Sequence, residues 1–190
     1  MYKIVCSGLF KIQWSSFYLY RMNLKSESPL KAASLQEIKS ELSALAVADL
    51  RKICLRLAKH KKENKELMSF LIFEAQDPET FTNKVKEEID RLFPEINTSN
   101  LYLAKKGLRK ILRIANKNIR FADTYEAEAE LLIHFCEQMK KSGIRYQGSQ
   151  VLTNLYNQQI KKIAAAISRM HEDLQFDYQK AFERIVEIRE

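Results

Sequence analysis

The sequence predicts an all-α fold of about eight antiparallel helices, arranged as a bundle or as a short HEAT-like helical stack. Only 4 glycines and 3 prolines occur in 190 residues, whereas sandwiches, barrels and βαβ folds need many turns that rely on these two residues. Apolar residues recur at helical spacing through most of the chain. With 46% hydrophobic and 29% charged residues, the composition is that of a globular protein and excludes intrinsic disorder of the whole chain.

The first 21 residues differ in pattern from the rest of the chain. They are rich in β-branched and aromatic residues, contain the only tryptophan, Trp14, and show no helical period. A lysine interrupts their apolar stretch, which argues against a signal peptide and a membrane span. Two interpretations stay open: a peripheral strand or hook, and the preferred one, a stretch upstream of a translation start at Met22. Residues 1–33 are predicted as a non-helical or poorly ordered extension and linker, and residues 34–190 as a single helical domain.

Three helices are predicted in the first part of the body. Ser34 and Glu37 have the spacing of a capping box, and the apolar positions after them predict a helix over 34–46. A second apolar period predicts a helix over 47–60. The apolar run after it predicts a short, buried helix over 63–75.

Two further helices are predicted in the middle of the chain. Asp77 and Pro78 read as an N-cap and a proline at the first helical position, and Pro94 ends that helix. Its predicted buried face consists of Phe81, Val85, Ile89 and Leu92. After a loop rich in capping residues, a long helix is predicted over 101–120.

The last third of the chain predicts three helices. Asp123 and Glu126 form a second predicted capping box, and Gly143 ends the helix that begins there. A glycine-bounded loop then leads to a long helix over 149–172, and a final helix is predicted over 176–188. Faint sequence matches between successive helix pairs agree with a HEAT-like repeat, although leucine- and lysine-rich helices also produce such matches by chance.

Several helix patterns succeed one another through the body of the chain. They are Leu35-x-x-Ile38-Lys39-x-Glu41-Leu42, Asp49-Leu50, Lys65-Glu66 with Phe70-Leu71, and Ala104-Lys105-Lys106 with Leu108 and Ile111. Together they resemble an uncharacterised family of small bacterial all-helical proteins, catalogued as a domain of unknown function. The resemblance covers about residues 34–188 and leaves out the first 21. It implies a helical fold and carries over no catalytic or binding residue.

The net charge of +8 is concentrated in one predicted helix, because residues 101–122 contain seven basic residues and no acidic one. At about 100° per residue most of these cations fall on one arc, opposite the apolar side. The arc consists of Lys106, Arg109, Lys110, Arg113, Lys117 and Arg120, and a smaller stripe on an earlier helix consists of Lys52, Arg56 and Lys59. These nine residues are the candidates for binding a nucleic acid or another anionic partner.

A solvated face or a protein-binding surface is the preferred interpretation of the basic arc. The next helix offers acids for partial neutralisation, namely Asp123, Glu126, Glu130 and Glu137. Against nucleic-acid binding, no aromatic stacking residues are interleaved with the cations and no nucleic-acid motif is evident.

The sequence predicts no catalytic residue, no cofactor and no metal site. Glu130, His134 and Glu137 share a helical face, but one helix cannot close a metal site and no second constellation matches it. Three widely spaced cysteines, an odd number, indicate a reducing compartment and a cytoplasmic location. Cys54 and Cys136 are predicted as small hydrophobic residues of the core.

The predicted function is that of a non-enzymatic helical interaction module, which presents helix faces to a macromolecular partner. A protein is the preferred partner, and the alternative is sequence-independent binding of RNA or DNA through the helix 101–120. No membrane insertion is predicted, and the oligomeric state stays open. An exposed apolar groove in the folded chain would favour a protein partner, and an uninterrupted basic stripe would favour a nucleic acid.

Overall fold

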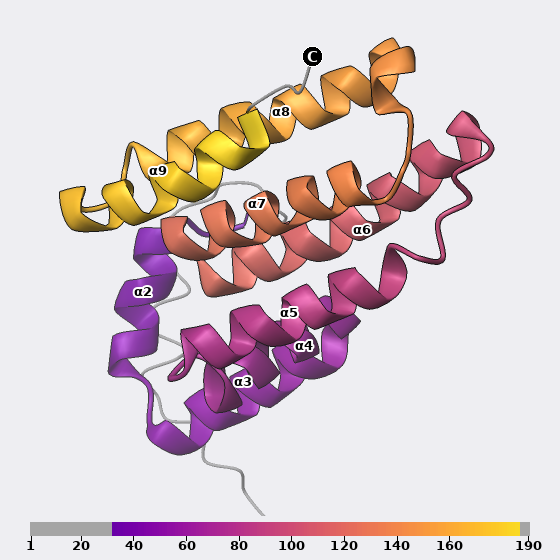
Figure 1. Cartoon of the computed structure of the whole chain (residues 1–190). Helices are drawn as coiled ribbons and strands as arrows, with labels where there is room; N and C mark the ends of the chain where they lie inside the picture. Colours follow the sequence, from indigo (N-terminus) through magenta and orange to yellow (C-terminus); the bar gives the residue numbers. More distant parts are fainter. Residues whose placement is uncertain (1–31, 187–190) are drawn as a thin grey trace, which may run out of the picture. The chain divides into compact units, whose positions relative to one another are not determined.

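The computed structural model describes residues 32–186, which contain eight α-helices, one short 3-10 turn and no strand (Figure 1). This confirms the predicted all-α fold. The helices are α2 (Leu35–Ala44), α3 (Val47–His60), α4 (Lys62–Phe73), α5 (Pro78–Leu92), α6 (Leu101–Ala122), α7 (Tyr125–Lys141), α8 (Gln150–Ile167) and α9 (Glu172–Val186), with the 3-10 turn η2 (Tyr146–Gly148) before α8. The predictions for residues 1–31 lie outside the described residues.

The contacts divide the chain into two units, Met1–Lys52 and Ile53–Glu190. The boundary falls within α3, inside the span 34–190 that the sequence groups as one domain. Each unit is therefore described by itself.

The first unit owes its helical structure to local signals. At the start of α2 the Glu37 N–H donates to Ser34 Oγ at 3.3 Å, and the Ser34 N–H donates to Glu37 Oε2 at 2.8 Å. This is the predicted capping box, which satisfies two backbone donors that the helix itself leaves without partners. No residue of α2 is buried, and none of α3 is buried either.

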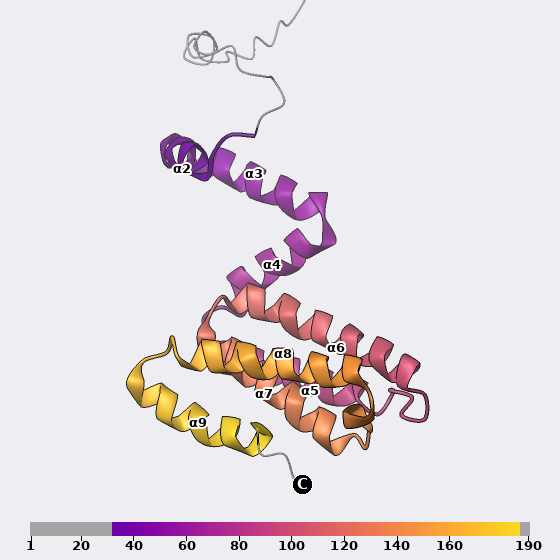
Figure 2. The same cartoon turned by 90° about the horizontal axis from the view of Figure 1, so that it is seen from above.

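The core of the second unit is built around α7, which packs against α5, α6, α8 and α9, with α9 also packed along α8 (Figure 2). Seventeen residues long, α7 has eight buried residues. Leu131, Leu132, Phe135, Cys136 and Met139 are wholly inaccessible to solvent. The apolar face of α7 is therefore the centre of the second unit.

The helix α5 begins as predicted. Asp77 Oδ1 accepts from the Thr80 N–H at 3.0 Å, and Pro78 occupies the first turn. The four predicted core residues of α5 are all buried. Asn100 caps the next helix, α6, which continues two residues beyond the predicted end at residue 120.

The prediction of a buried helix over 63–75 is wrong in one respect. The helix exists as α4, but Phe70 is its only buried residue. The Phe70 ring lies 4.5 Å from that of Phe81 and 6.4 Å from that of Phe121. Because α4 contacts the core along this one face, Leu67 and Met68 are half-buried, and Leu71, Ile72 and Phe73 stay exposed.

The second predicted capping box is also wrong. The N-cap of α7 is Thr124, whose Oγ1 accepts from the Ala127 N–H at 3.3 Å. Asp123 instead ends α6 in the left-handed conformation, with φ of 52°, which aspartate tolerates better than most residues. The predicted end of α7 at Gly143 is confirmed, since this glycine comes directly after the C-cap with φ of 71°.

The two C-terminal helices divide earlier than predicted. The predicted helix over 149–172 ends at Ile167, and the predicted helix over 176–188 begins already at Glu172. Between them the Met170 N–H donates to the Ile167 carbonyl at 3.0 Å, closing a turn, and Met170 is buried. The chain changes direction where this methionine is buried in the core. Helical periodicity alone does not reveal this change of direction.

Candidate functional site

Three of the six predicted cations of α6 contact carboxylates. The pairs are Lys117 with Glu66 at 3.2 Å, Arg120 with Glu63 at 2.8 Å and Lys110 with Glu95 at 4.0 Å. These acids belong to α4 and to the loop before α6, and not to α7, which the sequence offered as the source of neutralising charge. Lys106, Arg109 and Arg113 make no ion pair within residues 32–186. The basic arc is therefore neutralised at its C-terminal end, at Lys117 and Arg120, and elsewhere only at Lys110.

The smaller predicted stripe lies along α3. In the first unit Lys52 Nζ lies 3.0 Å from Asp49 Oδ1, and both side chains are exposed. In the second unit Arg56 and Lys59 are exposed. The principal helix neighbours of α6 are α4, α5 and α7, and of these three helices only α4 supplies acids to the basic arc.

Glu130 and His134, which share one face of α7, contact side chains of α5. Glu130 forms an ion pair with Lys86, and His134 Nε2 lies 2.6 Å from Asp90 Oδ1. Both partners belong to α5, so these contacts join the two helices. Among the described residues, no group of three or more histidine, cysteine or acidic side chains is arranged to hold a metal ion.

The two described cysteines differ in their surroundings. Cys136 is wholly buried in α7, and burial raises the pKa of its thiol to about 12. It is the core residue that the sequence predicts. Cys54 is exposed, so the prediction of a core position is wrong for it: the face of α3 that carries this residue has no neighbour in the described structure that buries it.

The first unit contains an apolar groove, which we call the N-terminal groove. It measures about 450 Å³ and is lined by Leu35, Ile38, Lys39, Leu42, Ser43 and Leu50. Leu35 is 86% exposed, Ile38 45% and Leu42 38%. The sequence showed these residues at helical spacing, but the spacing does not reveal whether another element covers them.

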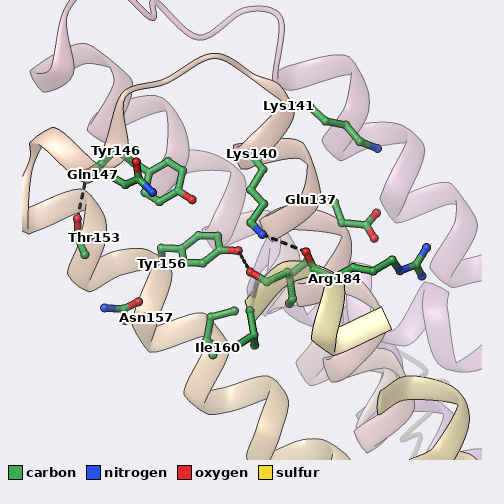
Figure 3. Close-up of a pocket in the computed structure, with 12 residues that line it drawn as sticks. Glu137, Lys140, Lys141, Tyr146, Gln147, Thr153, Tyr156, Asn157, Ile160 and Arg184 are labelled. Atoms are coloured by element: carbon green, nitrogen blue, oxygen red, sulfur yellow. Dashed lines mark hydrogen bonds between the residues drawn. The ribbon is translucent and has the colours of Figure 1, made fainter. Parts of the chain in front are cut away.

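The second unit contains a larger hollow, which we call the tyrosine cavity (Figure 3). It measures about 860 Å³ and is bounded by the end of α7, by η2, by α8 and by the end of α9. Its lining residues are Glu137, Lys140, Lys141, Tyr146, Gln147, Thr153, Tyr156, Asn157, Ile160, Arg184, Ile185 and Val186.

Two stacked tyrosines and two side-chain hydrogen bonds fix the walls of this cavity. The rings of Tyr146 and Tyr156 lie 5.0 Å apart at an angle of 19°. The Tyr156 hydroxyl donates to the Ile185 carbonyl at 2.7 Å, and Lys140 Nζ donates to the Arg184 carbonyl at 3.0 Å. Burial raises the pKa of both tyrosines above the ordinary value of 10. The end of α9 is thus held by side chains of α7 and α8.

Sequence reasoning found none of the basic residues of the tyrosine cavity. They come from two helices that lie more than forty positions apart in the chain, as the spacing of 44 residues between Lys140 and Arg184 shows. No local motif brings them together. Tyr146 and Tyr156, ten positions apart, are the nearest signal in the sequence, and nothing in their spacing points to a cavity.

The comparisons with known proteins give no further assignment: no family model, no curated protein and no solved structure matches the chain. Within residues 32–186, no helix is both long enough and apolar enough to span a membrane.

Proposed function

We propose that this chain is a non-enzymatic helical interaction module whose first unit binds an amphipathic helix of a partner protein. The observation that carries the proposal is the N-terminal groove. Its leucine and isoleucine side chains repeat at the spacing of a helix seam, and yet no residue of α2 or α3 is buried. An apolar groove open to solvent is a typical feature of a protein-binding surface.

The energetics favour a covered state of this groove. A helix as short as α2, with 10 residues, is only marginally stable in water without tertiary contacts. Full burial of a leucine or isoleucine side chain contributes about 1.5–3 kcal/mol. Covering Leu35, Ile38 and Leu42 therefore stabilises both the complex and the helix that forms the groove.

The charges around the groove select the chemistry of the partner. Lys39 lines the groove, while Glu37 is engaged in the helix cap and Asp49 is paired with Lys52. An apolar groove of this kind suits the helix-in-groove mode, in which residues at i, i+3, i+4 and i+7 of the partner enter it. Acidic residues that flank those anchors would complement Lys39 and the exposed Arg51.

A protein partner is favoured over a nucleic acid by the state of the basic arc. Carboxylates already contact Lys110, Lys117 and Arg120, which lowers the positive charge available to a phosphate backbone. The cations of the arc without an ion pair are Lys106, Arg109 and Arg113, and the paired Lys110 lies between them. An uninterrupted basic stripe, the feature that favours nucleic acid, is therefore lacking on this helix.

Site-specific photocrosslinking tests the proposal. In one variant a photoreactive phenylalanine derivative replaces Leu42 in the groove. In the reference variant it replaces Lys161, which is exposed on α8. We expect one discrete protein adduct from position 42 and none from position 161. The adduct is identified, and the binding of that purified protein to the unmodified chain is measured by calorimetry.

Matched variants then locate the contact. Ile38→Glu with Leu42→Glu places charges in the groove, and Val151→Glu with Leu174→Glu makes the same change at two exposed apolar positions of the second unit. The groove variant should weaken binding at least about tenfold, a loss of about 1.4 kcal/mol, and the control should not. Equal binding by both variants, an adduct of nucleic acid, or an adduct with a second copy of the chain would overturn the proposal.

A further inference from the structure

The tyrosine cavity has the dimensions of a small-molecule site and is independent of the N-terminal groove. Its volume of about 860 Å³ lies within the range of about 300–1,000 Å³ that is usual for ligand pockets. We infer that the tyrosine cavity binds a small, planar aromatic anion, whose ring lies against the tyrosine and isoleucine side chains and whose acidic group lies at Lys141 and Arg184.

The apolar part of the cavity suits a planar ring. Tyr156 is 6% exposed, and its hydroxyl is committed to the Ile185 carbonyl, so this ring is fixed before any ligand arrives. Tyr146 stacks on it and remains only partly buried. Aromatic rings bind one another in offset stacks or edge to face, and Ile160 adds aliphatic surface to the same wall. Binding a planar ring therefore requires little reordering of these side chains.

The charged part of the cavity selects an anion. Among residues 32–186, the lining contains three basic side chains, Lys140, Lys141 and Arg184, and one carboxylate, Glu137. Lys140 spans the cavity wall to the Arg184 carbonyl, and Figure 3 shows Lys141 and Arg184 reaching outward beside Glu137. The excess of positive charge repels a cation and attracts an anion.

The type of acidic group is indicated by Arg184 and by the uncharged polar side chains. The guanidinium group binds carboxylates and phosphates through two parallel hydrogen bonds, and a lysine adds a point charge. Gln147 and Asn157, on the opposite side of the cavity, offer amide donors and acceptors to ring substituents. Aromatic carboxylates and nucleoside monophosphates share this chemistry, so both are used as probes.

The test titrates the full-length chain, labelled with nitrogen-15, with 2-naphthoate or with adenosine monophosphate, up to about 5 mM. Their neutral counterparts, 2-naphthalenemethanol and adenosine, serve as ligand controls. We expect saturable shifts of the amide signals of Lys141, Gln147 and Asn157 with at least one anion, and much weaker binding of its neutral counterpart. The loss of affinity from each anion to its own neutral counterpart measures the contribution of the carboxylate or of the phosphate.

Two pairs of substitutions separate a built site from general attraction to a basic protein. Lys141→Gln with Arg184→Gln should weaken binding of the anion about tenfold, because two charge-assisted contacts are lost. Arg91→Gln with Lys161→Gln removes the same charges at two other exposed positions of the second unit and should leave the dissociation constant within about twofold. The thermal midpoint of each variant shows that it is folded.

Three results of the titration would overturn the inference: no saturable shift with either anion, equal affinity for the neutral counterparts, or shifts confined to residues of the N-terminal groove. An equal loss of affinity for the anion in both pairs of variants would overturn it as well. Because these readouts lie in the second unit and need no protein partner, their failure leaves the proposal for the groove untouched. Conversely, failure of the crosslinking experiment does not affect the tyrosine cavity.

Discussion

The helices α2 and α7 begin alike and end up in opposite environments. Each has a hydroxyl side chain at its N-cap, Ser34 or Thr124, that accepts a hydrogen bond from the backbone. Each carries apolar residues at helical spacing. Yet α2, in the first unit, has no buried residue, whereas α7, in the second unit, has eight. Local sequence thus specifies the helix, and the neighbouring elements decide whether its apolar face becomes core or stays exposed.

The contrast arises from what surrounds each helix. Four helices pack against α7 within the second unit, so each of its apolar side chains finds several partners. The described part of the first unit contains only α2 and the start of α3. Two short helices cannot enclose a core, and their apolar residues line an open groove instead.

Truncating one large side chain in each unit gives the largest expected difference. Phe135→Ala removes a ring that is 0% exposed and packs against Phe93, and should lower the free energy of unfolding by about 3–5 kcal/mol. Leu42→Ala, in the groove, should change it by no more than about 0.5 kcal/mol. Urea unfolding monitored by circular dichroism measures both. Similar losses for the two variants would show that the groove is core.

A smaller effect is expected at the wall of the tyrosine cavity. Tyr156→Phe removes the hydroxyl that donates to the Ile185 carbonyl, and should lower the free energy of unfolding by about 1–3 kcal/mol, because a buried acceptor loses its donor. Tyr102→Phe, at a tyrosine that is 68% exposed, is the matched control. No difference between the two would mean that the hydroxyl does not hold the end of α9.

The pH dependence of stability tests the burial of Cys136. The pKa of this thiol is raised by burial to about 12, so the unfolded chain loses the proton first. The stability that the buried Cys136 thiol contributes is fully present below a pH near 9, the pKa of the thiol in the unfolded chain. It is lost as the pH rises toward 12. The free energy of unfolding is measured at pH 7 and at about pH 9.5. Its fall between these two values of pH should be about 1 kcal/mol smaller in Cys136→Ala than in the unaltered chain.

The matched control is Cys54→Ala, at the exposed cysteine of α3. It should leave the pH dependence as it is in the unaltered chain. If the two cysteine variants show the same pH dependence, the thiol of Cys136 is not held in a water-excluded core.

The smallest expected effect is a gain in stability on replacing the buried Gln159. Gln159 is 4% exposed, and its side-chain oxygen has no hydrogen-bond partner among the described residues, although its amide donates to the Leu155 carbonyl at 2.9 Å. Gln159→Met has a similar shape and removes the unsatisfied acceptor, so it should raise the free energy of unfolding by up to about 1 kcal/mol. A loss of more than about 1 kcal/mol would show that this oxygen is satisfied in solution.

The sequence predicted those features that depend on neighbouring residues. The caps at Ser34 and Asp77, the range Val47–His60 and the end of α7 before Gly143 all depend on signals within a few residues. Backbone donors at a helix start need a local acceptor, and the acceptable residue types are few. Such features can be read without knowledge of the fold.

Features that depend on distant residues could not be predicted in this way. Periodicity continues through Ile167, but the burial of Met170 ends α8 there. Glu63 and Glu66, which pair with Arg120 and Lys117 of α6, lie on α4, more than 50 positions earlier in the chain. The tyrosine cavity requires the end of α9 to meet α7 and α8. In each case the outcome depends on tertiary packing between distant residues, and the local sequence is equally compatible with other outcomes.

Amide hydrogen exchange, resolved by residue on the free chain, tests the contrast between the two units most directly. We expect amides of α2 and of residues 47–52 to open with free energies of no more than about 2 kcal/mol, since no buried contact holds them. Amides in the middle of α7 should open only with global unfolding, near the full stability of the domain. Protection of α2 equal to that of α7 would contradict the account, because it would mean that the N-terminal groove is already covered in the free protein.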